Sequence, residues 1–194
     1  MSRRRIRDIR HDELIEATIT AVHKHGYAMV TMTEIAHEAG STAASINYYF
    51  GSKEKLLEAT MRRLLSRLKT AVLERMQGIS TPQDRLMALL DANFDDRIFT
   101  TEMCSLWVQF WGNAPYVPSL ARLQNINRAR VTSNFSAELR ELVRPSRRDT
   151  VREALQSYMD GVWVEAAQST GPLDAATARS EARRVARLLL ENEA

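Results

Sequence analysis

The chain has 194 residues, of which 44% are hydrophobic, and it contains only seven Gly and five Pro. Long stretches without helix breakers favour an all-α protein, large enough for one sizeable domain or for a small domain joined to a larger one. The formal net charge of +3 does not by itself indicate a nucleic-acid-binding protein. The single cysteine, Cys104, excludes an intramolecular disulfide bond and is typical of a reducing compartment.

The sequence also bears on location. No apolar run approaches the ~18 residues needed to span a bilayer, and the Arg-rich start is not followed by the apolar stretch of a secretory signal. We therefore expect a cytoplasmic protein without membrane contact.

Cys104 lies in a Met-, Leu- and Trp-rich helical pattern, so we interpret it as a small buried residue rather than a redox switch.

The first ten residues form a basic arm, with five Arg and one Asp. We expect Arg3, Arg4 and Arg5 in this arm to contact DNA along the minor groove or the phosphates, and the alternative is a solvated tail. Residues 1–60 as a whole contain eight Lys or Arg and eight Asp or Glu. A DNA-binding hypothesis therefore depends on this arm and on the motif that follows it, not on a basic domain.

That motif consists of two short helices that follow a first helix over residues 8–25. Thr31 and Glu34 have the spacing of a capping box, which predicts the start of the first short helix, and Gly40 is the residue type that ends helices. A second short helix is expected over residues 43–50. Two short helices joined around a Gly form a helix-turn-helix, whose second helix enters the major groove of DNA.

The second short helix is expected to divide its side chains between the core and DNA. Ile46 and Phe50 lie four residues apart and should face the core of the head. Asn47 offers a bidentate contact to adenine, and Ser45 can bond either base type. Phosphate oxygens suit the hydroxyls of Thr42, Tyr48 and Tyr49 and the ammonium of Lys53 at the next helix start. The residues left to face outward are Ala43, Ala44, Ser45, Asn47, Tyr48 and Tyr49.

The segment from Ala39 to Leu57 reads Ala-Gly, seven residues, Tyr-Tyr-Phe, two residues, Lys, two residues, Leu-Leu. It resembles the N-terminal motif of TetR-type transcriptional regulators. The resemblance implies a three-helix DNA-binding head, with DNA contacts at Thr33, Thr42, Tyr48, Tyr49 and Lys53. Three positions, Ser41, Ala44 and Asn47, depart from the common family pattern. Ala44 and Asn47 lie where base contacts are expected, so these two departures affect which operator sequence the protein would recognise.

Further fragments narrow the resemblance within that family. They are Leu-Leu-Glu-Ala-Thr-Met-Arg at 56–62, Arg-Leu-Gln at 122–124, Ser-Asn-Phe at 133–135 and Asp-Gly-Val-Trp at 160–163. Together they resemble the BetI-type group, which are choline-responsive repressors of glycine betaine synthesis. The resemblance implies a double-stranded operator as partner and choline, or a related quaternary ammonium compound, as effector, with no other cofactor.

Helical spacing of apolar residues continues to the end of the chain. It predicts about nine helices in all, including one long helix over residues 52–77. We expect a helix-turn-helix DNA-binding domain over residues 1–52 and an effector-binding and dimerisation domain over residues 53–194. Small residues on the last two helices suit tight packing, and TetR-type proteins form homodimers through the corresponding pair.

The aromatic residues suggest where an effector would bind. Trp107, Phe110 and Trp111 share one face of a helix, and such a stripe is by default part of a core. A quaternary ammonium is held by aromatic faces and a nearby carboxylate, and Asp160 and Trp163 share a face of another helix. With the BetI resemblance added, we expect a cavity formed by Trp107, Phe110, Trp111, Asp160 and Trp163.

These expectations combine into a mechanism. A two-fold dimer would place two reading helices in successive major grooves of a near-palindromic operator. Ligand in the bundle would shift the helix over residues 52–77 and thereby change the spacing of the heads. The alternatives are a repressor of an efflux or catabolic operon with another cationic or aromatic ligand, a ligand-independent DNA-binding protein, and a helical enzyme. No catalytic arrangement or metal-ligand cluster is suggested by the sequence.

Overall fold

The computed structural model describes residues 3–191, with side chains from Ile6 onward. Within these residues helices are the only regular secondary structure, which confirms the predicted all-α class and the predicted number of helices. The elements are α1 (Arg3–His25), α2 (Met32–Glu38), α3 (Ala43–Phe50), α4 (Lys53–Met76), α5 (Pro82–Asn93), α6 (Thr101–Asn113), η1 (Ala114–Tyr116), α7 (Pro118–Leu142), η2 (Pro145–Arg147), α8 (Arg148–Ala167) and α9 (Ala175–Glu191).

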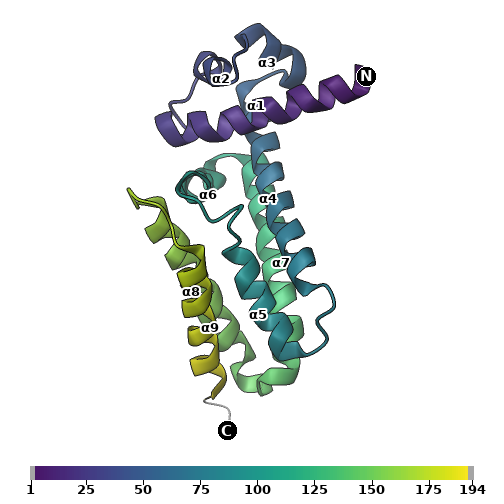
Figure 1. Cartoon of the computed structure of the whole chain (residues 1–194), viewed down its shortest axis with the longest axis vertical. Helices are drawn as coiled ribbons and strands as arrows, with labels where there is room; N and C mark the ends of the chain where they lie inside the picture. The colour runs from purple at the N-terminus through teal and green to yellow at the C-terminus, as the bar shows by residue number, and fades with distance from the viewer. Residues whose placement is uncertain (1–2, 192–194) are drawn as a thin grey trace.

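Helices α1 to α3 form a head at one end of the molecule (Figure 1). The capping box at the start of α2 is present: the Thr31 N–H donates to Glu34 Oε2 at 2.6 Å, and the Glu34 N–H donates to Thr31 Oγ1 at 3.2 Å. Ile46 is fully buried and Phe50 nearly so, which confirms that they face the core. Helix α1 begins at Arg3, five residues before the predicted start.

Helix α4 leaves the head and runs down the bundle, where it packs against α5 and α7 (Figure 1). Its first turns belong to the head's core, because Leu56 and Leu57 are buried there. Two arginines on α4 form ion pairs with acidic residues of α1, Arg63 with Asp12 and Arg67 with Glu16. The head and α4 are therefore joined by both apolar packing and charge pairing.

Helices α5 to α9 form the larger bundle, in which α8 and α9 lie side by side along one edge (Figure 1). Cys104 on α6 is fully buried, as predicted, and burial raises the pKa of its thiol to about 12. A thiol in this state is a poor nucleophile and a poor redox sensor. No helix in the described part of the chain is both long enough and apolar enough to cross a membrane.

A buried charge cluster, which apolar periodicity does not reveal, joins α4 to the loop after α5. The Asp95 carboxylate is only 6% exposed and accepts from Arg97 Nε at 2.8 Å and from Arg75 Nη2 at 3.1 Å. The hydrogen bonds from Arg97 are the main cause that lowers the pKa of Asp95 to about 2. Arg97 also pairs with Glu74 at 2.6 Å.

We predict that this cluster makes stability sensitive to acid. Because the folded-state pKa of Asp95 is below the ordinary 3.8, its contribution is complete above that value and is lost as the pH falls toward about 2. Asp95→Asn should lower the free energy of unfolding at neutral pH by about 1.5–3 kcal/mol and should flatten its decline between about pH 5 and about pH 2. Urea denaturation followed by circular dichroism at several pH values measures both effects. An unchanged pH dependence would remove this role from Asp95.

Candidate functional site

Helix α3 presents a polar surface to solvent. Asn47 is exposed, Ser45 is partly exposed, and the Tyr48 side chain is 76% exposed. Tyr48 also packs edge-on against Tyr49, with ring centroids 5.2 Å apart, and Tyr49 is itself half-buried against the core. Thr42 caps the helix by accepting from the Ser45 N–H at 3.1 Å, so the Ser45 hydroxyl remains available.

Other residues predicted to contact DNA flank this surface. Thr33 is exposed in the first turn of α2. The Lys53 ammonium donates to the carbonyls of Val30 at 3.0 Å and Ala28 at 3.4 Å, so it anchors the loop between α1 and α2. An ammonium group has three donors, which leaves one for a phosphate oxygen. The side chains of Arg3, Arg4 and Arg5 lie outside the described residues.

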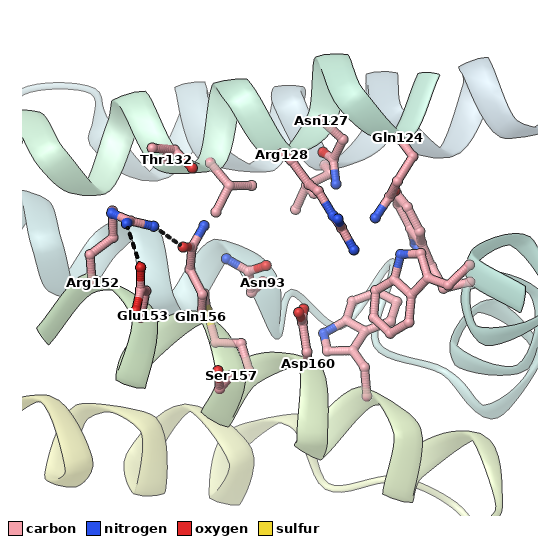
Figure 2. Close-up of a pocket in the computed structure, with 16 residues that line it drawn as sticks. Asn93, Gln124, Asn127, Arg128, Thr132, Arg152, Glu153, Gln156, Ser157 and Asp160 are labelled. Carbon is pink, nitrogen blue, oxygen red and sulfur yellow. Dashed lines mark hydrogen bonds and ion pairs between the residues drawn. The ribbon is translucent and has the colours of Figure 1, made fainter. Parts of the chain in front are cut away.

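A cavity of about 350 Å³ lies inside the bundle. Its walls come from five helices, α4 to α8 (Figure 2). All three tryptophans of the chain line it, together with Asp160 and a set of amides and arginines. The cavity therefore brings together residues that are as much as 95 positions apart in the sequence, from Leu68 to Trp163.

The tryptophans form one end of the cavity. The rings of Trp107 and Trp163 are nearly perpendicular, with centroids 5.9 Å apart, and the centroid of Trp111 lies 6.1 Å from that of Trp107. Phe110, which we expected in the cavity, does not line it. It is fully buried and supports Trp107 from behind, at 5.7 Å between centroids.

Asp160 extends from α8 into the cavity (Figure 2). Burial is the main effect on its carboxyl and raises its pKa, while the positive charge of Arg128 acts in the opposite direction. Asp160 still contacts solvent through the opening of the cavity, so its carboxylate lacks only part of its hydration. A cation that enters the cavity can therefore replace that lost hydration with a direct charge interaction.

The side of the cavity that α7 forms is polar, and the sequence pattern did not indicate it. Arg128 and Gln124 reach into the cavity from α7 (Figure 2). In the amide orientation that satisfies both donors, the Gln124 oxygen accepts from Trp111 Nε1 and Arg128 Nε, each at 3.3 Å. Two buried atoms in the cavity lining have no hydrogen-bond partner: Asn127 Oδ1 and Arg152 Nε.

Helix α6 connects this cavity to the head. On the side of α6 that faces the head, Gln109 Oε1 accepts from the Tyr27 N–H at 2.5 Å, and its amide nitrogen donates to the Val22 carbonyl at 3.5 Å. Tyr27 follows directly after α1 in the loop that leads to α2. The helix that carries Trp107 and Trp111 is thus hydrogen-bonded to the head.

Comparison with known families accounts for both parts of this arrangement. The family described as bacterial regulatory proteins, tetR family, matches residues 14–60. The family described as BetI-type transcriptional repressor, C-terminal, matches residues 82–191. The chain belongs to the TetR family. It is a DNA-binding transcriptional regulator with a BetI-type C-terminal domain, and it is not an enzyme.

Similar proteins extend over nearly the whole chain. An HTH-type transcriptional regulator BetI from Burkholderia thailandensis is 34% identical over 186 residues, 95% of each chain. The BetI regulator of an Escherichia coli strain is 36% identical over 181 residues, 92% of each chain. A TetR transcription regulator from Haloarcula marismortui shares the fold with a TM-score of 0.78 at 24% identity, covering 96% of this chain and 98% of its own.

One solved structure contains a ligand of the expected class. A transcriptional regulator from Saccharomonospora viridis, crystallised in complex with choline, has a TM-score of 0.76 at 20% identity and covers 90% of this chain and 93% of its own. At this identity the similarity shows the fold alone. The chemistry of the cavity in this regulator must therefore be argued from its own residues.

Proposed function

We propose that this regulator represses genes for the conversion of choline to glycine betaine and that choline, or a related quaternary ammonium compound, releases it from its operator. The observation that carries the proposal is the cavity, in which three tryptophans and Asp160 meet. Aromatic rings attract a quaternary ammonium by about 0.5–2 kcal/mol each. Relatives that are more than 30% identical carry the name BetI, and this supports the proposal that the regulated genes are those of glycine betaine synthesis.

The operator would be read by α3 in a homodimer. Asn47, Ser45 and Tyr48 supply amide and hydroxyl groups for bases and phosphates. The outer face of α8 suits a dimer contact, because Val164 is 38% exposed and no atom of the described residues lies within 4 Å of a Cβ placed on Gly161. A two-fold axis beside α8 and α9 places the two heads on successive major grooves of a near-palindromic site.

The route from ligand to head runs through α6 as well as through α4. Helix α4 contributes only Leu68 to the cavity, whereas α6 contributes Trp107 and Trp111. A ligand that moves these rings moves α6, and Gln109 transmits the movement to the end of α1 and to Tyr27. The sequence predicted the role of α4 from its length, but the hydrogen bonds of Gln109 became visible only in the fold.

We predict that Gln109→Ala uncouples the two sites. Allosteric coupling is usually worth 5- to 150-fold in affinity, and the variant should reduce the effect of choline on operator affinity to about 2-fold or less. Choline binding should change little, because Gln109 does not line the cavity. Fluorescence anisotropy of labelled operator with and without choline measures this. The control is Gln156→Ala, which removes an amide from the cavity lining instead. If choline still weakened operator binding of Gln109→Ala as it does in the wild type, the route through α6 would be excluded.

The proposed function is tested on the DNA upstream of the regulator's own gene. A mobility-shift assay at moderate salt should show tighter binding to this DNA than to a shuffled duplex of the same length. Choline at millimolar concentration should release the specific complex, whereas a bulky aromatic drug cation should not. Release by the drug cation alone would instead favour a repressor of an efflux operon, and equal affinity for both duplexes would exclude an operator there.

A further inference from the structure

The cavity has a second chemical character that choline does not use. Besides the aromatic end with Asp160, it contains two arginines, Arg128 and Arg152, and one more carboxylate, Glu153. The lining thus carries two positive and two negative side chains and is formally neutral. A bare cation is complementary to only one part of such a lining.

We infer that the preferred effector is a zwitterion, with a quaternary ammonium group at the tryptophan end and a carboxylate or similar anionic oxygen group toward Arg128. The inference rests on the proposed function, because it concerns the same pocket and the same cationic group. It adds the second half of the ligand and the residues that would bind it.

The size of the cavity supports a longer ligand. Its volume of about 350 Å³ falls in the range of about 300–1,000 Å³ that is usual for drug-sized molecules. Choline is much smaller and would fill only part of this space. A ligand that continues beyond the quaternary ammonium toward α7 uses more of this volume.

The charges on the walls indicate where the anionic group would lie. Arg152 is already paired with Glu153 at 3.1 Å and donates to Gln156 Oε1 at 2.7 Å (Figure 2). Arg128 has no carboxylate within ion-pair distance among the residues that the structure describes, and its one hydrogen-bond partner is the neutral amide of Gln124. Arg128 is therefore the guanidinium in this cavity that lacks a carboxylate partner in direct contact, although its charge also acts on Asp160, and it can bind an anionic ligand group.

The unpartnered atoms fit a ligand rich in oxygen. Arg152 Nε is a buried donor without an acceptor, and Asn127 Oδ1 is a buried acceptor without a donor. Buried polar groups are rarely left without partners in folded proteins. A hydroxyl group between the two charged ends of a ligand would satisfy Asn127, whereas Arg152 lies beside Glu153 at the end of the cavity away from Arg128 (Figure 2) and has no part in this assignment.

L-carnitine carries a quaternary ammonium, a hydroxyl and a carboxylate in this order, so we choose it as the probe. Choline, which has the quaternary ammonium but no carboxylate, is the comparison ligand. Because all three tryptophans line the cavity, quenching of intrinsic fluorescence reports binding directly. In the wild type, L-carnitine should bind about 10-fold more tightly than choline, as expected for one additional charge-assisted contact. Arg128→Gln should abolish this preference and leave choline affinity equal or slightly higher. Arg122→Gln, an exposed arginine on the same helix outside the cavity, should behave as the wild type.

The outcomes separate this inference from the proposed function. If choline binds and L-carnitine binds equally or more weakly, the zwitterion is excluded while the choline proposal stands. If neither choline nor L-carnitine quenches tryptophan fluorescence, both the choline proposal and the zwitterion inference fail. If the preference for L-carnitine persists in Arg128→Gln, the assignment of the anionic end to Arg128 is overturned.

Discussion

Replacing Asn47 with Ala is expected to weaken operator binding by at least about 30-fold, because a dimer loses one base contact in each half-site at about 1 kcal/mol or more each. Binding to random duplex should hardly change, since non-specific affinity comes from the phosphates. Asn47 is exposed on α3 and Ile46 beside it is buried, so the substitution leaves the core of the head intact. Fluorescence anisotropy with operator and shuffled duplexes at one salt concentration measures both affinities.

The matched control for this experiment is Asn125→Ala. Asn125 is also an exposed asparagine on a helix, but it lies on α7, away from the head. It should bind both duplexes as the wild type does. If Asn47→Ala weakened binding to the two duplexes equally, Asn47 would contact the phosphate backbone and the base readout would have to come from other residues of α3.

Replacing Asp160 with Asn is expected to weaken choline binding by about 10-fold or more, because the carboxylate supplies the negative charge nearest the tryptophans. The amide keeps the shape of the side chain, so the fold and DNA binding without ligand should be unchanged. Tryptophan fluorescence titrations measure the affinity. Glu165→Gln, which removes a carboxylate from the exposed side of the same helix, is the control.

We also expect Asp160 to make choline binding depend on pH. Burial raises the pKa of Asp160 above its ordinary value, with Arg128 opposing the shift. The carboxylate is therefore neutralised at a higher pH than an ordinary aspartate, and choline affinity should fall as the solution is acidified toward that pKa. Asp160→Asn should not show this fall. A wild-type affinity that stays constant from neutral pH down to 3.8, the ordinary pKa of an aspartate, would mean that Asp160 does not pair with the cation.

The sequence was sufficient for the architecture, because helix ends and apolar faces are local properties. Thr31, Thr42, Ser52, Thr81 and Thr100 each cap a helix through a side-chain oxygen. Spacing of apolar residues over three and four positions then gave each helix its buried face. The start of α1 was missed, because residues 3–7 are basic and carry no such apolar pattern.

The candidate site was only partly predictable, because a cavity depends on how helices meet. Spacing on α6 put Phe110 on the same stripe as Trp107, and the structure shows that it packs behind that ring. No local pattern in the sequence marks Arg128 as a cavity residue, although it reaches into the cavity (Figure 2). The contacts of Gln109 span 82 residues to Tyr27, and no local pattern encodes such a distance.

Operator affinity in the presence and absence of saturating choline is the most direct measurement of ligand-dependent release. Anisotropy titrations of the wild-type dimer against its own upstream DNA, with tryptophan quenching recorded in the same samples, show occupancy and affinity together. We predict that full occupancy of the cavity weakens operator binding at least about 5-fold. An operator affinity that stays the same while quenching shows a filled cavity would contradict the link between pocket and head.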